Sequence, residues 1–273
     1  MCWTTIEITN SDELLRRLLS YDSGWLFRGH TSATWGLEST LERVLAPIGW
    51  KPDLAKTCED YALHIFHSRA HHYISRDLLP ATKLGWLSLM QHHGVPTRLL
   101  DFTESPFIGL FFAFDDVSPA QGDACAVWAI EYRKVMKASV ELLRSSIGGF
   151  EYEYTDVQMH PDEIFEKYVD RSSHDVLWVT EPLLYNLRLE RQKGTFLLSG
   201  NIQKRITDLL RARPIRDSIH KIVIPAYLAD DVFHILGSMG IDSSRLFSDL
   251  DGMAKDIKRM MVHQVPNKLT VNL

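Results

Sequence analysis

One stretch of the sequence, residues 91–106, places a dense run of polar side chains directly before one of the longest apolar runs of the chain. The apolar run, residues 107–114, follows Ser105 and Pro106. Because proline is favoured in the first turn of a helix, this pattern predicts a buried helix. Polar groups that are forced against a core must be satisfied by one another. The stretch therefore predicts a tightly bonded polar cluster at the edge of the core.

The polar side chains of this stretch have two structural explanations beside a functional one. Arg98 and Asp101 can form a buried ion pair that holds a loop, because a buried charge needs a partner. Asp101 or Thr103 can also cap the helix that begins at Ser105. The sequence leaves open whether these side chains line a pocket or hold one together.

Periodic patterns elsewhere predict a mixed structure. Apolar spacing, caps and stop signals predict helices at residues 11–20, 53–73, 82–94, 105–114, 161–169, 200–211, 228–239 and 251–262. Short apolar runs predict strands at residues 25–28, 124–132, 175–180, 194–198 and 220–225. No linker, repeat or low-complexity tract divides the chain. We therefore expect a single α+β domain over residues 1–273, in which several short strands form a small mixed sheet surrounded by helices.

Composition is that of an ordinary globular protein, with 45% hydrophobic and 24% charged residues. The apolar runs fall far short of the roughly 20 residues that a membrane span needs. The N-terminal sequence has neither the basic nor the apolar part of a signal peptide. Cys2, Cys58 and Cys125 are odd in number and far apart, which argues against a disulfide framework. A cytoplasmic protein without a membrane partner is the expectation.

The net charge of −5 argues against a general nucleic-acid footprint, but the charge is uneven. Residues 188–216 hold eight basic and two acidic side chains, which gives this segment a charge of +6. Arginine suits a bidentate grip on phosphate. A charge run is also commonly a solvated helix face, and the sequence does not decide between the two.

Three shorter stretches carry further candidate residues. Residues 27–30 are Phe-Arg-Gly-His at a predicted strand end, where an arginine can reach a buried anion or pair with a core carboxylate. The glycine there lets a backbone or a ligand approach closely. If residues 186–196 are extended, alternation places residues 188, 190 and 192 on one face. Residues 246–252 are rich in ordinary turn residues and predict a structural helix entry.

Histidines raise the question of a metal. His64, His67 and His71 share a helical face, and two imidazoles four residues apart can bind zinc. No glutamate lies within that spacing and no cysteine pair accompanies it, so we expect a solvated or groove-facing stripe and no metal. The sequence also lacks a P-loop, a G-x-G-x-x-G motif and the G-x-S-x-G of serine hydrolases.

These stretches together resemble the FRG domain family, which is named for its Phe-Arg-Gly motif. Residues 27–30 match the name motif, and residues 91–103 are similar to the family's longest signature, with Phe102 where Trp is commoner. The resemblance covers roughly residues 23–257.

The later motifs match less closely. The third motif is represented by Asn186, Arg188, Gln192, Gly194 and Phe196. Between them, Glu190 and Arg191 stand where smaller residues are expected. Residues 246–252 are similar to the C-terminal signature, with Ser248 where Pro is commoner.

The motif layout also resembles that of ADP-ribosyltransferases and implies an ADP-ribosyltransferase-like fold. In that layout an arginine on an early strand grips NAD, a Ser/Thr-bearing strand shapes the nicotinamide pocket, and a later Glu or Gln orients the ribose. The resemblance implies Arg28 for the first part, Thr103 and Ser105 for the second, and Glu190 or Gln192 for the third. The residues implied to bind NAD are Phe27, Arg28, Gly29, His30, Arg98, Thr103, Ser105 and Arg188. Those implied in catalysis are Arg28, His93, Asp101, Glu190 and Gln192.

The implied chemistry needs charge stabilisation and a base. Breaking the nicotinamide–ribose bond generates oxocarbenium-like positive charge, which a carboxylate or amide beside the ribose stabilises. A second group takes a proton from the acceptor. The candidates for that group are Glu190, Asp101, His93 and His30. If Gln192 holds the third position, its neutral amide cannot serve as the base.

The resemblance thus implies an NAD-dependent ADP-ribosyltransferase, of the kind found among bacterial toxins and anti-phage effectors, with NAD as substrate and no metal. The acceptor is a nucleic acid, with RNA favoured by the basic segment 188–216, or a protein. A toxin also implies a neutralising antitoxin protein. The alternatives are an NAD glycohydrolase, a nuclease toxin, or a non-enzymatic nucleotide- or nucleic-acid-binding module. We predict that Arg28, His93, Arg98, Asp101 and Gln192 line one cleft.

Overall fold

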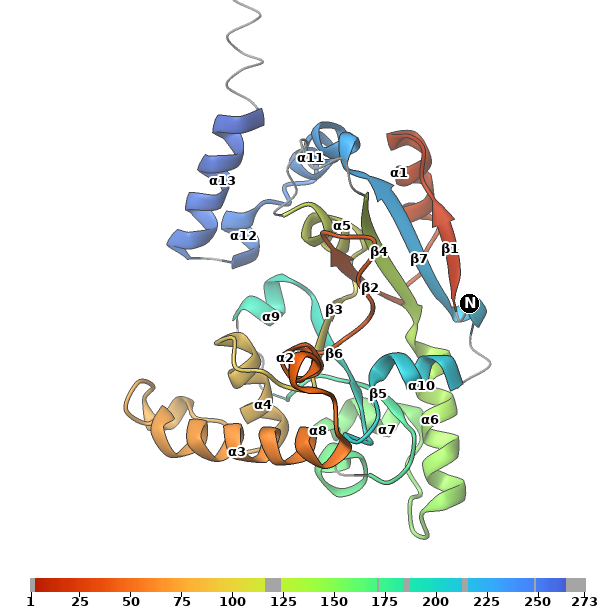
Figure 1. The fold of residues 1–273 in the computed structure, drawn as a ribbon, viewed down its shortest axis with the longest axis vertical. Coiled ribbons are helices and arrows are strands. Elements are labelled where there is room, and N and C mark those ends of the chain that lie inside the picture. Colours follow the sequence, from red (N-terminus) through yellow and green to blue (C-terminus); the bar gives the residue numbers. More distant parts are fainter. Residues whose placement is uncertain are drawn as a thin grey trace, which may run out of the picture.

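The computed structural model describes residues 3–115, 124–170, 172–183, 187–212, 216–247 and 249–263. Within these residues, the centre of the molecule is a seven-stranded sheet of order β1-β7-β4-β2-β3-β6-β5 (Figure 1). Its strands are β1 (Thr4–Glu7), β2 (Trp25–His30), β3 (Leu100–Thr103), β4 (Ala124–Glu131), β5 (Leu177–Thr180), β6 (Gly194–Ser199) and β7 (Ile219–Pro225). β1 and β7 are parallel, and the other neighbouring pairs are antiparallel. A mixed sheet among helices confirms the α+β prediction.

Helices surround this sheet. The α-helices are α1 (Ser11–Leu19), α2 (Thr40–Leu45), α3 (Pro52–Ala70), α4 (Lys83–His92), α5 (Pro106–Phe114), α6 (Tyr132–Ser146), α7 (Tyr154–Met159), α8 (Pro161–Ile164), α9 (Leu187–Arg191), α10 (Ile206–Ala212), α11 (Ala229–Ser238), α12 (Ser243–Phe247) and α13 (Leu250–His263). A π-helical turn, η4 (Phe165–Val169), follows α8. Short 3-10 turns are η1 (Ala46–Ile48), η2 (Arg76–Leu78), η5 (Arg216–Ser218) and η6 (Ala226–Leu228).

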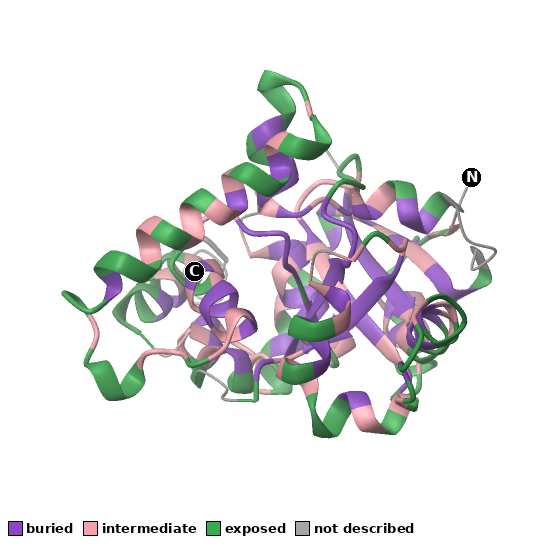
Figure 2. Ribbon diagram, turned by 90° about the horizontal axis from the view of Figure 1, so that it is seen from below, coloured by how far each residue is buried: buried purple, intermediate pink, exposed green. Residues whose placement is uncertain are grey.

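The two faces of the sheet carry separate cores, because successive side chains of a strand point to opposite faces. On β2 and β4, Leu26 and Trp128 pack into a cluster with α4, α6 and α10. Their neighbours Phe27 and Val127 pack into a second cluster with α1, α5 and α11. Figure 2 shows the sheet buried between helices whose outer faces are exposed.

Two glycines allow α5 to cross β2 in direct contact. A Cβ atom on Gly29 of β2 would lie 2.2 Å from both the Gly109 carbonyl oxygen and the Ala113 nitrogen of α5. A Cβ atom on Gly109 would lie 2.8 Å from the Phe27 Cβ. The close approach expected at Gly29 is therefore made by the backbone of α5.

The predicted elements match the structure best where they are apolar. β2, β4, β6 and β7 and the helices α1, α3, α4, α5, α11 and α13 were each predicted within a few residues of their observed bounds. The helix predicted at 200–211 is shorter and begins at Ile206. Local patterns do not predict β1, β3, α2 or α6, although the resemblance implies a Ser/Thr-bearing strand at Thr103, which is the end of β3. Where a loop held by Arg98 and Asp101 is expected, β3 begins at Leu100. The condition under which residues 188, 190 and 192 would share one face, an extended run over 186–196, is not met, because Leu187–Arg191 is the helix α9.

Among the described residues, no helix is both long enough and apolar enough to span a membrane.

Candidate functional site

A cleft of about 930 Å³ opens where β2, β3 and the start of β6 lie side by side. Residues of three of the candidate sequence stretches, 27–30, 91–103 and 186–196, line it. From β2 and the loop that follows come Phe27, Arg28, Gly29, His30, Thr31, Thr34, Trp35, Gly36, Glu38 and Arg43. From α4, β3, α5 and the α9–β6 region come Ser88, Gln91, His92, Asp101, Phe102, Thr103, Phe112, Arg188, Leu189, Gln192 and Phe196.

Arg28 lies on the central strand β2 and is fixed by two hydrogen bonds. Its Nε donates to the His30 Nε2 at 3.1 Å, and its Nη1 donates to the Asp101 backbone carbonyl at 2.6 Å. The side chain is 17% exposed and lines the cleft. Burial lowers the pKa of Arg28, and the nearby Asp101 carboxylate opposes that shift. Since arginine stays protonated in proteins, Arg28 presents a permanent, oriented positive charge to the cleft.

His30 positions Arg28 and does not act as a base in the cleft. Burial, together with the positive charges of Arg28 and Arg43, lowers the pKa of His30 to about 3. The imidazole is therefore neutral at physiological pH, and its Nε2 lone pair is occupied by the Arg28 Nε. This geometry argues against His30 as the base that the sequence allowed, although it does line the cleft.

Asp101 is the carboxylate most closely associated with Arg28. Its Oδ2 lies 3.8 Å from the Arg28 Nη1 and accepts a hydrogen bond of 2.8 Å from the Gln91 Nε2. Gln91 is itself oriented, because its Oε1 accepts a hydrogen bond from the Thr97 hydroxyl at 2.7 Å. The Asp101 side chain is 54% exposed, so a ligand in the cleft can reach it. Sequence reasoning missed Gln91 as a site residue, although it opens the polar stretch.

Arg98 lies outside the cleft, and its predicted pairing with Asp101 is wrong. Its Nε donates to both Glu59 carboxylate oxygens at 2.9 and 2.8 Å, and its Nη2 contacts Glu59 and lies 3.0 Å from an Asp170 oxygen. Arg98 does form a buried ion pair, as predicted, but with other carboxylates than Asp101. The partners come from α3 and from the residue after η4, far away in sequence, which no local pattern reveals.

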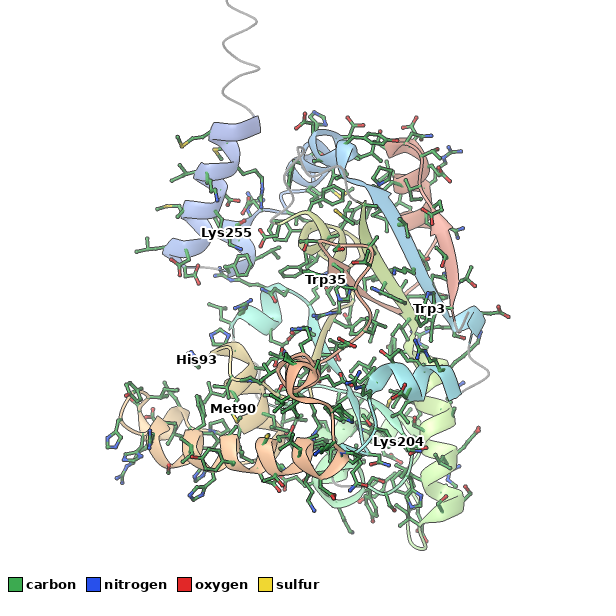
Figure 3. The ribbon with its side chains drawn as sticks, in the orientation of Figure 1. Trp3, Trp35, Met90, His93, Lys204 and Lys255 are labelled. Carbon is green, nitrogen blue, oxygen red and sulfur yellow. The ribbon has the colours of Figure 1, made fainter. Side chains whose placement is uncertain are left out.

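His93 also lies outside the cleft lining, contrary to the prediction of a shared cleft. It is the residue after α4 and lies at the outer end of that helix (Figure 3). Its neighbour His92 lines the cleft instead. Burial and the charges of His93 and Arg188 lower the pKa of His92. At a helix end a shift of one residue changes the direction of a side chain by about 100°, so sequence alone could not choose between the two.

Thr103 and Ser105 have different roles at the end of β3. The Thr103 hydroxyl donates to the Gln192 backbone carbonyl at 2.6 Å and accepts from the Ser105 nitrogen at 3.1 Å. Thr103 lines the cleft, whereas Ser105 does not and instead caps α5 by accepting from the Ile108 nitrogen. The prediction that Asp101 or Thr103 caps this helix is therefore wrong. The Thr103 hydroxyl therefore links β3 to residues 186–196 by a hydrogen bond.

Of residues 186–196, the third motif, some line the cleft and others lie at the surface. Arg188 and Gln192 line the cleft, whereas Glu190 is exposed on α9 and lies outside the cleft lining. Gln192 follows α9, and its Nε2 donates to the Leu246 backbone carbonyl at 3.3 Å. Lys193 then adopts a φ of 44°, which ends the helical turn and leads into β6. Asn186 lies outside the described residues.

Residues 246–252, the C-terminal motif, contact residues 186–196. Phe247 of α12 contacts two cations, because the Arg188 guanidinium and the Lys255 ammonium each lie 4.9 Å from its ring centroid. The Asp249 carboxylate accepts a hydrogen bond of 2.7 Å from the Gly252 nitrogen at the start of α13, as expected of a structural helix entry. Ser248 lies outside the described residues.

The charge of the cleft favours an anion. Arg28, Arg43 and Arg188 face two carboxylates, Glu38 and Asp101. Sequence reasoning missed Arg43 and Glu38, because neither belongs to a recognisable motif.

Aromatic groups complete the lining, among them Trp35, which is 56% exposed near the middle of the molecule (Figure 3). Cations together with exposed rings suit a ligand that carries both phosphate and planar bases.

The basic segment 188–216 does not form one continuous face. Lys204 pairs with Asp175, Arg205 lies 4.0 Å from Glu38, and Arg211 lies 3.9 Å from Asp208. The side chains of residues 213 and 216 lie outside the described part. Asp175 and Glu38 lie outside the segment and therefore offset part of its charge excess.

No group of three or more His, Cys, Asp or Glu side chains in the described ranges is arranged to hold a metal ion.

Comparison with known families identifies one domain. Residues 23–122 match the family model of the FRG domain, and this range contains the stretches 27–30 and 91–103. The chain therefore carries an FRG domain, as the motifs predict. The stretches 186–196 and 246–252 lie beyond the matched range. No curated protein and no solved structure shows significant similarity to the chain.

Proposed function

We propose that the cleft binds NAD and that the protein transfers the ADP-ribose group from NAD to an acceptor. The observation that carries this proposal is the adjacency of β2, β3 and β6 in the sheet. Arg28, Thr103 and Gln192 come from these strands or their ends and line one cleft. An ADP-ribosyltransferase-like site needs its arginine, its Ser/Thr strand and its Glu or Gln side by side in this way.

The cleft suits NAD in size and in charge. Its volume lies in the range of about 300–1,000 Å³ that is usual for small-molecule sites. Arg28, Arg43 and Arg188 provide donors for the pyrophosphate. Because His30 and the Asp101 carbonyl fix the Arg28 guanidinium, little side-chain freedom is lost when it binds phosphate.

In this proposal Gln192 and Asp101 have different roles at the ribose. The Gln192 amide is neutral and can orient ribose hydroxyls, but it cannot take a proton. Asp101 is a carboxylate that a ligand can reach, and Arg28 and Gln91 hold it at the cleft. We assign it the role of the base. Glu190 lies outside the cleft lining and has no part in the proposal.

The reaction then proceeds as a displacement at the ribose. The bond between C1′ and the nicotinamide nitrogen breaks, and its electron pair neutralises the pyridinium. The positive charge that develops on the ribose is stabilised by the Asp101 carboxylate and the Gln192 amide oxygen. The nucleophilic atom of the acceptor bonds to C1′, and its proton passes to Asp101.

The proposed acceptor is a nucleic acid, with RNA first. The exposed Trp35 and the arginines of the cleft suit base stacking and phosphate contact. A protein acceptor is the other outcome of the test below. Such an enzyme would act as a bacterial toxin or anti-phage effector in the cytoplasm, with a neutralising antitoxin protein as partner.

The test uses NAD labelled in its adenylate part, incubated with the protein and with RNA, DNA or cell lysate. We expect label on a macromolecule and release of nicotinamide. Arg28→Gln and Asp101→Asn should each lower the rate by at least about 100-fold, in line with the loss of a charge-stabilising or base group. Arg144→Gln, an exposed arginine outside the cleft lining, is the matched control and should keep full activity.

Other results would name a different activity. Free ADP-ribose without labelled macromolecule would indicate an NAD glycohydrolase, and RNA cleavage without NAD would indicate a nuclease. If the folded protein releases no nicotinamide under any of these conditions, the proposal is overturned. If it also cleaves no RNA, a binding module remains.

A further inference from the structure

Arg188 of α9 keeps more hydrogen-bond donors available for a ligand than the other arginines of the cleft. Its side chain is partly exposed and lines the cleft. Among the described residues, no hydrogen bond or ion pair engages its guanidinium. Arg28 and Arg43, in contrast, each make two hydrogen bonds to protein acceptors. The planar fork of N–H groups on Arg188 is therefore available for bidentate binding of a phosphate.

The ring of Phe247, at the end of α12, holds this guanidinium in place. The guanidinium carbon of Arg188 lies 4.9 Å from the ring centroid, which is a cation–π contact. The attraction comes from the charge distribution of the aromatic face, so it occupies none of the N–H groups. Arg188 is thus fixed and still open to an anion, and it loses less side-chain freedom when an anion binds.

The Phe247 ring is itself held by two longer helices. Its centroid lies 6.4 Å from that of Phe111 and 6.2 Å from that of Phe112, both on α5. The ring of Phe112 is nearly perpendicular to it, at 81°, and Phe112 also lines the cleft. Lys255 of α13 places its ammonium 4.9 Å from the same centroid. The ring therefore packs against α5, which lies directly on β2, and against α13.

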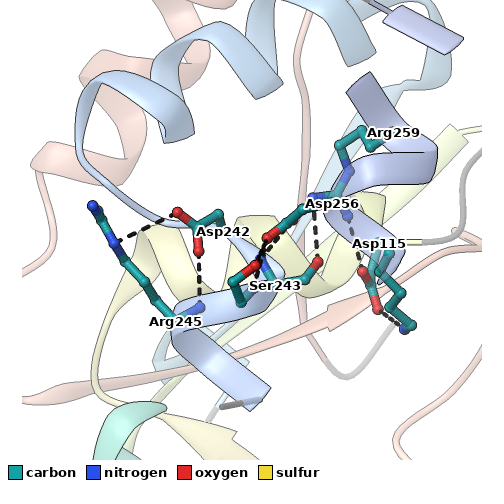
Figure 4. Close-up of polar contacts among 8 residues, drawn as sticks. Asp115, Asp242, Ser243, Arg245, Asp256 and Arg259 are labelled. Atoms are coloured by element: carbon teal, nitrogen blue, oxygen red, sulfur yellow. Dashed lines mark hydrogen bonds and ion pairs between the residues drawn. The ribbon is translucent and has the colours of Figure 1, made fainter. Parts of the chain in front are cut away.

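Helix α13 also fixes α12, the short helix that carries this ring (Figure 4). The Asp256 carboxylate of α13 accepts hydrogen bonds from the backbone nitrogens of Ser243 and Ser244, at 2.9 and 2.7 Å, where α12 begins. Arg259 donates to Asp256 at 3.2 Å and to Asp115, the residue after α5, at 3.0 Å. The helices α5, α12 and α13 are thus bonded to one another, and the ring belongs to a braced element.

The residue before Phe247 contacts a second side chain of the cleft. The backbone carbonyl of Leu246 accepts a hydrogen bond of 3.3 Å from the Gln192 Nε2. Leu246 is buried, at 4% exposure, so this acceptor is anchored in the core. Two consecutive residues of α12 therefore contact Arg188 and Gln192, the two cleft-lining polar residues of the third motif.

We propose that Phe247 is a positioning residue that holds Arg188 for binding the diphosphate of a nucleotide ligand. Arg28, which is fixed by its protein partners, supplies a charge of set position. Arg188 supplies two parallel N–H groups for the phosphate oxygens. The inference rests on the proposed function for its ligand, NAD or a related nucleotide, and is independent of the transfer reaction. Its consequence is an effect on binding that is measured without turnover.

Isothermal titration calorimetry of the full chain with ADP provides the test. ADP carries a diphosphate like that of NAD but has no nicotinamide to lose, so its binding is measured whether or not the protein transfers ADP-ribose. We expect ADP to bind the wild-type protein. Arg188→Met should weaken that binding by at least about tenfold, because charged hydrogen bonds to phosphate are lost.

Substitutions of Phe247 separate positioning from general packing. Phe247→Leu keeps an apolar contact with α5 but removes the aromatic face, and it should weaken ADP binding about 3- to 10-fold. Phe247→Tyr keeps the face and should bind ADP within about twofold of the wild-type protein. In the Arg188→Met background, Phe247→Leu should have no further effect, because Phe247 acts through Arg188. If Phe247→Leu does not fold, Phe247→Met, a flexible apolar replacement, takes its place.

Phe66→Leu is the matched control, because Phe66 is a partly buried phenylalanine of α3 outside the cleft lining. It should leave the affinity for ADP unchanged, and circular dichroism checks that every variant is folded. The inference is overturned if the wild-type protein does not bind ADP, if Phe247→Leu and Phe66→Leu have equal effects, or if the effects of Phe247→Leu and Arg188→Met add.

Release of nicotinamide from NAD tests the proposed function separately. A protein that binds ADP with these variant effects but releases no nicotinamide would overturn the transferase proposal and support the role of Phe247. A protein that releases nicotinamide, but in which Phe247→Leu binds ADP as tightly as Phe247→Tyr, would overturn the role of Phe247 alone.

Discussion

Gly29 contacts the backbone of α5 so closely that no side chain fits between β2 and the helix. A Cβ atom there would lie 2.2 Å from two backbone atoms of α5, and neither can move aside as a flexible side chain would. The glycine of the Phe-Arg-Gly stretch therefore has a packing role. It lets α5 pack directly on the strand that carries Arg28.

We predict that Gly29→Ala destabilises the fold by about 3 kcal/mol or more, at the upper end of the cost of overpacking a core. Urea denaturation followed by circular dichroism measures the change. Gly148→Ala is the matched control, because nothing lies within 4 Å of a Cβ atom at that position. It should change the free energy of unfolding by less than about 1 kcal/mol. Equal midpoints for the two variants would show that α5 yields to the added methyl group.

At the scale of elements, Arg98 connects parts of the chain that are distant in sequence. It lies just before β3, and its partners are Glu59 of α3 and Asp170 after η4. All three side chains are buried or nearly so, and Asp170 also accepts from Lys83 at the start of α4. This network joins α3, α4 and η4 to the strand that carries Asp101.

We predict that Arg98→Met destabilises the protein by about 3–5 kcal/mol, because Glu59 is left as a buried charge without its partner. Arg211→Met removes an exposed pair and should cost less than about 1 kcal/mol. If Arg98→Met does not fold, the double variant Glu59→Leu/Arg98→Met should recover soluble protein, since an apolar pair can replace a buried ion pair. A midpoint for Arg98→Met equal to that of Arg211→Met would contradict the role of this network.

Sequence patterns predicted those elements whose burial is visible in local spacing. α5 and β4 are almost wholly apolar, and both were predicted with nearly correct bounds. β3 has four residues and follows a polar run, so no local pattern distinguished it from a loop. α9 is a short helix in which alternating polar residues also fit an extended strand.

The candidate site shows the same limit. Arg28, Asp101 and Gln192 line one cleft, and each could be predicted as a site residue because it belongs to a recognisable motif. The partners of Arg98 and the cleft position of Glu38 depend on contacts between distant segments. Local sequence patterns do not predict contacts of this kind.

At the scale of the whole molecule, the two half-cores meet at a sheet whose central strand ends in a buried histidine. His30 is 5% exposed and neutral, with its pKa lowered from 6.5 to about 3. The unfolded chain binds a proton at this histidine below about pH 6.5, whereas the folded protein does so only near pH 3. Between these values the unfolded state holds more protons, so the free energy of unfolding falls as the pH falls.

We predict that this one group removes about 2 kcal/mol of stability between pH 7.5 and pH 5, since each pH unit below 6.5 contributes about 1.4 kcal/mol. His30→Gln keeps an acceptor for the Arg28 Nε but does not titrate, so its unfolding free energy should depend less on pH. Urea denaturation of both proteins at the two pH values measures the difference between the slopes. Because only residue 30 differs between the two proteins, contributions from the rest of the chain cancel from this comparison. Identical slopes would mean that His30 gains a proton without cost in the folded state, and that Arg28 is then held by the Asp101 carbonyl alone.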